Sequence, residues 1–352
     1  MNFNIVSLPG DGIGPEISEA VAAVLIAIGR KYDHDFHLIE KLIGGAAIDQ
    51  CGNALPNDTL AACKSAHAVF LAAIGGPKWD NSEIRPEQGL LKLRSELEVY
   101  ANVRPLTMFP SLLSASPLKP EILQGTDFVI VRELTGGIYF GKRGRGNEST
   151  AEEYATDECK YSVKEIERIA RVAFDLAMAR DKQLTSVDKA NVLETSKLWR
   201  SVVSRIGERE YPEVSLNHQL VDSCAMKLIQ SPSEFDVILT ENLFGDILSD
   251  EASVLAGSMG LLASSSVGSK YGLFEPIHGS APDIAGQGIA NPYATILSIA
   301  MMLRWLKLNE EANDIEQAVS KVIEKGVLTR DLDANSKLTT QQAIAAVVKE
   351  IG

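Results

Sequence analysis

The chain has 352 residues, and its 34 Lys and Arg residues against 47 Asp and Glu residues give a formal net charge of −13. Hydrophobic residues make up 45% and charged residues 23%, which is typical of a folded globular protein. The length exceeds what one hydrophobic core usually serves, so we expect two domains. The negative balance argues against a nucleic-acid-binding protein, although a local group of arginines can still bind an anion.

The N-terminal segment lacks a basic region, and Pro9 and Gly10 interrupt its apolar run, so we expect no signal peptide. The longest apolar stretches, near 21–28 and 294–303, are shorter than the ~18 residues of a membrane span. The four cysteines form neither a C-x-x-C pair nor a zinc pattern. These features predict a cytoplasmic protein with reduced thiols and no membrane partner.

The first predicted elements are a strand at 5–8 and a helix at 15–30, separated by a glycine-rich turn. This order is typical of an α/β unit, and Pro15 suits the first turn of the helix. The turn at 10–14 is not G-x-G-x-x-G, because its third glycine comes one residue early. The acidic residue expected about 20 residues later is also misplaced, Glu40 being the nearest. A standard Rossmann site is therefore not expected.

Later in the chain, short apolar runs predict buried strands at 68–74, 128–131 and 237–239. Apolar spacing predicts helices at 162–180, 292–307 and 315–324, the first of them opened by a capping box of Ser162 and Glu165. The segment 137–160 differs, because it is rich in glycine and charge and has weak periodicity. It is either a surface loop or an arm that reaches another subunit.

Three arginines that converge can bind a di- or tricarboxylate, because a guanidinium pairs bidentately with a carboxylate. They are Arg94, Arg104 and Arg132. One of them follows the predicted strand at 128–131, and another precedes Pro105, which favours extended backbone. The alternative, slightly favoured by spacing alone, is that each makes a local salt bridge with Glu96, Glu98 or Glu133.

Asp246 and Asp250 are one helical turn apart, where two like charges repel unless a cation lies between them. Carboxylate oxygens suit Mg²⁺ or Mn²⁺. The alternative is that Asp246 caps a helix and Asp250 is solvated. Apolar neighbours such as Ile247 and Leu248 weaken that alternative, since they leave little polar face.

Two further residues are candidates for proton transfer. Lys189 is flanked by apolar residues, and partial burial of a lysine makes it a usable base. Tyr139 can donate a proton. Each of them alone is more often a packing residue. The small-residue segment 275–291 is a weak nucleotide-binding pattern in which Asp283 can accept hydrogen bonds from a ribose; the alternative, favoured for this motif alone, is an ordinary surface loop.

Taken together, these segments resemble the β-decarboxylating dehydrogenases, the isocitrate/isopropylmalate dehydrogenase family, along essentially the whole chain. The matching motifs are LPGDGIGPE (8–16), GGPKWD (75–80), RPEQGLL (85–91), VRELTGGIYFG (131–141), DKANVL (188–193), NLFGDILSD (242–250) and the loop 278–291. The resemblance implies an α/β two-domain fold with a central mixed sheet flanked by helices. An NAD-binding domain comprises 1–100 and 256–352, and a dimerisation domain comprises 101–255, with its arm at 137–160.

The resemblance also implies a role for each matched residue. Tyr139 and Lys189 are the acid/base pair. Arg94, Arg104, Arg132 and Asp222 bind substrate. Asp222, Asp246 and Asp250 bind Mg²⁺ or Mn²⁺. NAD is bound by Gly76, Glu87, Asn191, His278, Gly279, Ser280, Ala281, Pro282, Asp283, Ile284 and Asn291. Because Lys189 and Asp222 reach into the second subunit's site, the resemblance implies an obligate homodimer with shared active sites.

The implied reaction is oxidative decarboxylation of (2R,3S)-3-isopropylmalate to 4-methyl-2-oxopentanoate and CO₂, a step of leucine biosynthesis. Tartrate, homoisocitrate and isocitrate are the alternative substrates. A pocket formed by Leu90, Leu91 and the partner's Val192 suits an isopropyl group and disfavours a polar one. Asp283 favours NAD over NADP, because it repels a 2′-phosphate. Two features depart from the family pattern: Cys224, which can sensitise the site to oxidation if accessible, and the glycine-free segment 330–335.

Overall fold

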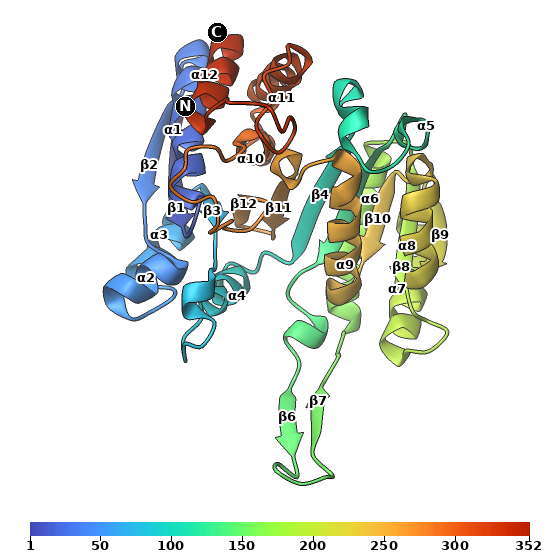
Figure 1. Cartoon of the computed structure of the whole chain (residues 1–352). Helices are drawn as coiled ribbons and strands as arrows, with labels where there is room; N and C mark the ends of the chain where they lie inside the picture. The colour runs from blue at the N-terminus through green and yellow to red at the C-terminus, as the bar shows by residue number, and fades with distance from the viewer. The chain divides into compact units, whose positions relative to one another are not determined.

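The computed structural model describes residues 1–352 and divides into two compact units. The first unit consists of Met1–Val99, Phe109–Pro117 and Ala256–Gly352, so it contains both ends of the chain (Figure 1). The second unit consists of Tyr100–Met108 and Leu118–Leu255. The chain therefore enters the second unit twice, first for one short segment and then for most of that unit, and returns to the first unit each time.

The first unit is built on five strands in the order β2-β1-β3-β12-β11, in which only β11 is antiparallel to its neighbour β12. The strands are β1 (Asn2–Gly10), β2 (Asp35–Glu40), β3 (Ala68–Ala73), β11 (Ala263–Val267) and β12 (Gly272–Pro276). The helices are α1 (Gly14–Tyr32), α2 (Gly44–Cys51), α3 (Asn57–Ser65), α4 (Pro86–Glu96), α10 (Tyr293–Trp305), α11 (Asn309–Glu324) and α12 (Thr340–Ile351).

Both faces of these strands are covered, because successive side chains point to opposite sides of a sheet. Ile5 and Phe70 pack into a cluster with apolar residues of α1, α10, α11 and α12. Their neighbours Val6 and Leu71 pack into a second cluster with residues of α3 and α4. Strands buried on both faces read as continuous apolar runs, which is why β3 could be predicted from composition.

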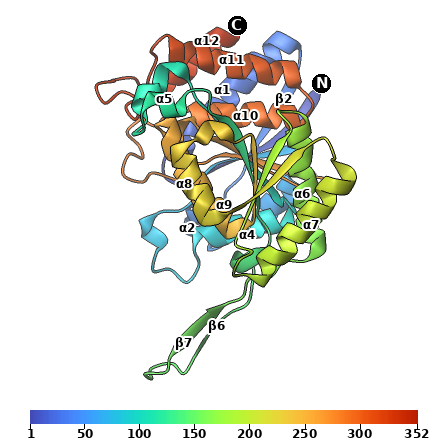
Figure 2. The same cartoon turned by 90° about the vertical axis from the view of Figure 1, so that its right-hand side faces the viewer.

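The second unit has five strands in the order β4-β5-β10-β8-β9, in which β4 is antiparallel to β5 and the rest are parallel. They are β4 (Ala101–Thr107), β5 (Asp127–Glu133), β8 (Gln183–Asp188), β9 (Ser215–Leu220) and β10 (Val237–Thr240). Its helices are α5 (Pro120–Leu123), α6 (Val163–Met178), α7 (Glu194–Glu210), α8 (Val221–Gln230) and α9 (Asn242–Ser253). Helices α6 and α7 cover one face, and α8 and α9 cover the other (Figure 2).

The segment 137–160 forms a hairpin that projects from the second unit (Figures 1 and 2). Its strands β6 (Arg143–Gly146) and β7 (Tyr154–Asp157) are antiparallel and pair only with each other. The side chain of Tyr154 is exposed. The segment predicted as a surface loop or an arm therefore lies on the surface, and its two halves form paired strands.

The mixed α/β class with helix-flanked strands is confirmed, as are the predicted strands and helices. The capping box is present: Ser162 Oγ accepts from the Glu165 N–H, and Glu165 accepts from the Ser162 N–H. Helix α11 begins at Asn309 rather than at 315. Glu310 and Glu311, which precede the regularly spaced apolar residues, form the first turn, where acidic side chains are favourable. None of the helices is long and apolar enough to span a lipid bilayer.

Candidate active site

Arg132, Tyr139 and Asp246 form one hydrogen-bonded cluster in the second unit. Arg132 lies near the end of β5, Tyr139 ends the short 3₁₀ helix Gly137–Tyr139, and Asp246 lies on α9. The guanidinium Nη1 of Arg132 is paired with Oδ1 of Asp246. The Tyr139 hydroxyl donates to Oδ2 of Asp246 at 2.7 Å. One carboxylate is therefore shared by a guanidinium and a phenol.

The environment of this cluster sets the protonation of both acidic groups. Burial, together with the hydrogen bond to Asp246 and the charge of Asp246, raises the pKa of Tyr139 to about 12. Burial opposes ionisation of Asp246, but the charge of Arg132, the Tyr139 hydroxyl and the charge of Arg104 lower the pKa of its carboxyl overall. The phenol therefore keeps its proton at neutral pH beside an ionised carboxylate, as a proton donor requires.

Arg104 contacts the second aspartate of α9. Its Nη1 lies 3.6 Å from Oδ1 of Asp250 and donates to Oγ of Ser249 at 2.5 Å, and its Nε donates to Oδ1 of Asn102 at 2.8 Å. The side chain of Asp250 is 66% exposed. Two arginines thus lie beside the two aspartates of one helix, an arrangement that suits binding of a small dianion together with a cation.

Of the alternatives for these residues, the solvation of Asp250 is confirmed, and the capping role of Asp246 and the local arginine salt bridges are wrong. Asp246 does not cap α9, because Glu241 does so by accepting from the Phe244 N–H at 2.6 Å. Arg94 pairs with Glu275 and Arg132 pairs with Asp246, and two of the neighbouring glutamates have other partners. Glu96 pairs with Lys64, and Glu133 pairs with Arg168.

Asp222 and Lys189 form a separate ion pair. Nζ of Lys189 lies 2.5 Å from Oδ1 of Asp222, on α8, and this bond lowers the pKa of the Asp222 carboxyl. Lys189 stands in the loop after β8, where its backbone N–H donates to Oγ of Ser196 at 3.0 Å and the carboxylate of Asp188 accepts from the Ala190 N–H. The following residues, including Asn191 and Val192, are exposed.

The three predicted metal ligands are not brought together within one chain. Asp246 and Asp250 are one turn apart on α9, whereas Asp222 is engaged by Lys189. No group of three or more His, Cys, Asp or Glu side chains in the chain could hold a metal ion. The donor chemistry of Asp246 and Asp250 fits Mg²⁺ or Mn²⁺, but the pair alone is an incomplete ligand set.

In the first unit, α4 carries the remaining predicted substrate residues. Arg94 Nη2 lies 2.7 Å from Glu275 Oε1, and both side chains are largely buried. Leu90 and Leu91 are half-buried on the same helix. The carboxylate of Glu87 lies against Gly75: a Cβ at Gly75 would lie 2.7 Å from Glu87 Oε1. Gly75 has a positive φ, which favours glycine, and the next residue, Gly76, leads into the 3₁₀ helix Pro77–Trp79.

The loop between β12 and α10 borders a pocket of about 460 Å³. From this loop come His278, Gly279, Ala281, Ile284, Ile289, Ala290 and Asn291. The backbone N–H of Ile13 donates to the Ser280 carbonyl at 2.8 Å, which ties the β1–α1 turn to the loop. Pro282 and Asp283 are exposed in the loop. The pocket is therefore formed by segments far apart in sequence.

The lining of this pocket fits the nucleoside half of a dinucleotide. Its walls are mostly apolar, and Nε2 of His278 is buried in it without a hydrogen-bond partner. Burial lowers the pKa of His278, so its imidazole is neutral. A neutral imidazole nitrogen and apolar walls suit an uncharged heteroaromatic ring, and the pocket size matches that of a ligand of this kind.

Two charged residues of this pocket, Arg330 and Asp331, were not predicted as site residues from the sequence. Arg330 and Asp331 belong to the segment interpreted only as a departure from the family pattern, yet both line the pocket. Oδ2 of Asp331 accepts from Nδ2 of Asn291 at 2.9 Å and also from Ser258. Nothing in the local sequence indicates these contacts, because the segments are distant in the chain.

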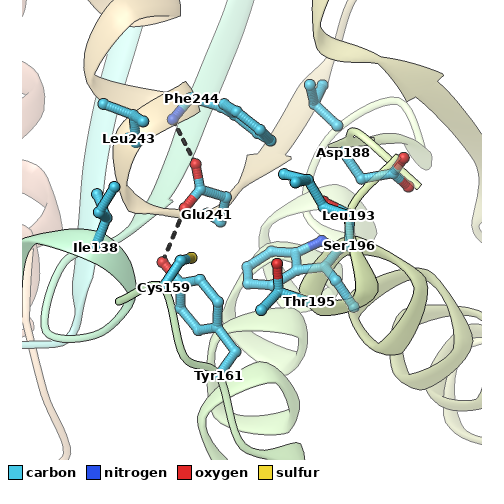
Figure 3. A pocket seen from close by; sticks show the side chains of 12 residues that line it. Ile138, Cys159, Tyr161, Asp188, Leu193, Thr195, Ser196, Glu241, Leu243 and Phe244 are labelled. Carbon is cyan, nitrogen blue, oxygen red and sulfur yellow. Dashed lines mark hydrogen bonds between the residues drawn. The ribbon is translucent and has the colours of Figure 1, made fainter. Parts of the chain in front are cut away.

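A second pocket, of about 170 Å³, lies in the second unit beside the Tyr139 and Lys189 segments (Figure 3). Its walls are mostly apolar and include Ile138, Leu193, Trp199 and Phe244. It contains no arginine or lysine, so it does not suit a dicarboxylate.

Cys224 is fully buried, and burial raises the pKa of its thiol to about 12. The accessibility on which its expected sensitivity to oxidation depended is therefore absent.

Comparison with known proteins identifies the family of the chain. Residues 4–347 match the isocitrate/isopropylmalate dehydrogenase family model. The 3-isopropylmalate dehydrogenase of Bacillus subtilis is 53% identical, over 99% of this chain and 97% of that protein. That of Pseudomonas syringae is 54% identical, over 99% and 98%. The crystal structure of isocitrate dehydrogenase from Methylococcus capsulatus has a TM-score of 0.89 at 36% identity, and 99% of each chain is covered. The chain therefore belongs to the isocitrate/isopropylmalate dehydrogenase family.

Proposed function

We propose that the protein catalyses the NAD-dependent oxidative decarboxylation of (2R,3S)-3-isopropylmalate to 4-methyl-2-oxopentanoate and CO₂ in leucine biosynthesis, in the cytoplasm. The observation that carries this proposal is the Arg132–Asp246–Tyr139 cluster in a chain whose full-length relatives at 53–54% identity are 3-isopropylmalate dehydrogenases. The cluster joins a carboxylate-binding group to a proton donor, and a protein that only binds a dicarboxylate needs no such donor.

Arg94, Arg104 and Arg132 hold the two malate carboxylates, because planar guanidinium groups pair bidentately with carboxylates. Lys189 accepts the proton of the C2 hydroxyl during oxidation. This role requires that Lys189 be released from its ion pair with Asp222, so that its amine can contact the C2 hydroxyl. Tyr139 donates its proton to the carbon that loses CO₂, and its protonated state at neutral pH supports that role.

The cofactors of this reaction are assigned to two groups of residues. Asp246 and Asp250, with the partner's Asp222, would hold Mg²⁺ or Mn²⁺. The pocket beside His278 and Asn291, with the neighbouring Gly76, Glu87 and Asp283, would hold NAD. Bound NAD supplies the hydride acceptor, and a bound divalent cation supplies positive charge that lowers the pKa of the C2 hydroxyl.

Selection of the substrate depends on the group at C3 of the malate. Leu90, Leu91 and the partner's Val192 provide the apolar surface for an isopropyl group, and a carboxylate there would lose its hydrogen bonds to water. Val192 is 65% exposed in the single chain, as expected for an apolar side chain that completes a second subunit's site. Asp283 accepts from a ribose 2′-hydroxyl and repels a 2′-phosphate, which favours NAD.

A homodimer with shared sites accounts for two features of the single chain. Exposed apolar side chains lie on α8 and α9, which pack against each other on one face of the second unit, and directly after α9: Met226, Ile229, Ile247 and Val254. A group of this kind is typical of a protein–protein interface rather than of free surface. The incomplete metal-ligand set on α9 also requires a ligand from elsewhere. We expect Ile247→Glu to convert the dimer to monomers in sedimentation velocity and to abolish turnover.

The direct test of the function is a panel of initial rates with 3-isopropylmalate, isocitrate, homoisocitrate and tartrate, each with NAD⁺ and with NADP⁺, in the presence of Mg²⁺. The expected result is that kcat/KM for 3-isopropylmalate with NAD⁺ exceeds every other combination by at least about a hundredfold, because an apolar pocket strongly rejects a charged group. The fold match to an isocitrate dehydrogenase makes isocitrate the second candidate. Equal or greater kcat/KM for isocitrate would overturn the assignment of Leu90 and Leu91.

A further inference from the structure

The side-chain amide of Asn242 forms every hydrogen bond of which it is capable. Oδ1 accepts from Nε of Arg132 at 3.0 Å and from Nη2 of the same guanidinium at 2.7 Å. Nδ2 donates to the backbone carbonyls of Leu134 at 3.2 Å and Gly136 at 3.0 Å. Arginine only donates and a carbonyl only accepts, so the partners define the orientation of the amide. Asn242 is fully buried, so water cannot replace any of the four bonds.

The partners of Asn242 belong to two functional groups. Arg132 is a carboxylate-binding arginine whose remaining nitrogen, Nη1, is paired with Asp246. Leu134 and Gly136 belong to the backbone that leads directly into the 3₁₀ helix on which Tyr139 stands. Tyr139 in turn donates to Asp246. Asn242 therefore closes a ring of contacts that contains both the carboxylate-binding group and the proton donor.

The aliphatic part of the Arg132 side chain is held by packing, whereas the orientation of its guanidinium is set by hydrogen bonds. A Cβ at Gly245 would lie 2.7 Å from Cγ of Arg132, so this aliphatic part packs closely against the α9 backbone. The end of the side chain is oriented by what its nitrogens contact, and two of the three nitrogens bond to Asn242. When substrate and a cation engage Asp246, the two hydrogen bonds to Asn242 still orient the guanidinium.

Asn242 is itself held by the residues around it. Its backbone N–H donates to the hydroxyl of Tyr161 at 3.0 Å, and that hydroxyl donates to Oε2 of Glu241 at 3.1 Å. The other oxygen of Glu241 caps α9 at the Phe244 N–H (Figure 3). The ring of Tyr161 packs edge-on against Trp199, with centroids 5.6 Å apart. The first turn of α9 is therefore anchored in the core of the second unit.

We infer that Asn242 is a positioning residue for catalysis: it holds the Arg132 guanidinium and the Tyr139 segment in the arrangement that binds the substrate carboxylate and places the proton donor. Tyr161 supports this role by fixing the backbone of Asn242. The inference rests on the proposed function, because it concerns the same site.

The test compares Asn242→Ala and Tyr161→Phe with wild type in steady-state kinetics and in calorimetric binding of 3-isopropylmalate. Asn242→Ala is expected to raise both KM and Kd for 3-isopropylmalate by about tenfold or more, because hydrogen bonds to a charged group are lost, and to lower kcat as well. Tyr161→Phe keeps the ring and removes only the hydroxyl, so we expect a smaller change in the same direction. Tyr211→Phe is the matched control, since it removes a phenol bonded to Asp175 at 2.8 Å that has no contact with this network.

A purely structural role predicts a different pattern, in which the fraction of active enzyme falls while KM and Kd stay constant. To separate the two roles, Asn242→Ala is also introduced into the Arg132→Lys variant. If Asn242 acts through the guanidinium, adding Asn242→Ala to Arg132→Lys should raise KM little further. The positioning role alone would be overturned if KM and Kd stayed unchanged in Asn242→Ala and Tyr161→Phe. It would also be overturned if Asn242→Ala raised KM as much in the Arg132→Lys background as in wild type. Absence of both turnover and binding in wild type would instead overturn the proposed function.

Discussion

Replacing Tyr139 with phenylalanine removes one hydroxyl and leaves the ring, so its effects on stability and on chemistry can be separated. The lost hydrogen bond, 2.7 Å to the Asp246 carboxylate, is to a charged acceptor. Such bonds contribute about 1.5–3 kcal/mol, and partial solvent access brings the expected loss of unfolding free energy to about 1–2 kcal/mol. Asp246 keeps its pairing with Arg132, so the cluster does not collapse.

The expected effect on turnover is larger than the effect on stability. A positioned general acid contributes about 10²–10⁴-fold to rate, or about 3–5 kcal/mol of barrier. We therefore expect kcat of Tyr139→Phe to fall by about 10²-fold or more, with KM for 3-isopropylmalate changed by less than about threefold because the arginines remain.

The assay is the initial rate of NADH formation, followed by absorbance, alongside urea unfolding of the same preparations. Tyr32→Phe is the matched control, since the Tyr32 hydroxyl also donates to an aspartate, Asp314 at 2.6 Å, and its pKa is likewise raised to about 12. The control should lose stability and keep kcat. A kcat for Tyr139→Phe within about threefold of wild type would refute the role of Tyr139 as proton donor.

Three further predictions concern the metal, the nucleotide pocket and the core. Asp246→Asn should raise the Mg²⁺ concentration that gives half-maximal rate by at least about tenfold, and an unchanged metal titration would exclude Asp246 as a ligand. Because burial lowers the pKa of His278 below the 6.5 of a free imidazole, the unfolded chain binds more protons, so unfolding free energy should fall as pH drops below 6.5. His278→Asn should flatten that dependence in urea titrations, and an unaltered slope would contradict this. Trp199→Ala, at a fully buried position, should lower unfolding free energy by about 3–5 kcal/mol, and a loss below about 1 kcal/mol would contradict its place in the core.

The sequence predicts those strands whose burial on both faces requires a continuous run of apolar residues. The strand β3 is apolar throughout and β10 is apolar except for Thr240, and both were predicted close to their observed bounds. The strand β11 was not predicted, because Ser264, Ser265 and Ser266 are buried yet polar. The antiparallel partner β12 satisfies their backbone groups, and a pairing of this kind has no local signature.

The candidate site was predictable as a set of residues but not as a set of contacts. The spacing of Asp246 and Asp250 indicates one helix face, yet the partners Arg132 and Tyr139 lie more than a hundred positions away in the chain. Asn242 had a local signal, since it precedes Asp246 by four residues and so shares its helix face. An asparagine in a helix's first turn usually serves the helix end itself, which is why that spacing did not single it out.

The pairing of Lys189 with Asp222 is the contact that the sequence indicates least. Both residues were predicted to act at a second subunit's site, and in the single chain they engage each other. In the proposed homodimer, assembly of two chains would separate this pair and complete each site.

The most direct test of a site shared between subunits is complementation between two inactive variants. Lys189→Ala and Tyr139→Phe are each expected to be nearly inactive, since each removes one half of the acid/base pair from every site. In a mixed dimer of the two, one site carries both substitutions and the other carries neither. Unfolding and refolding an equimolar mixture should therefore restore about a quarter of the wild-type kcat, with KM for 3-isopropylmalate unchanged. A mixture that stays as inactive as its components, while forming dimers, would contradict the shared active site.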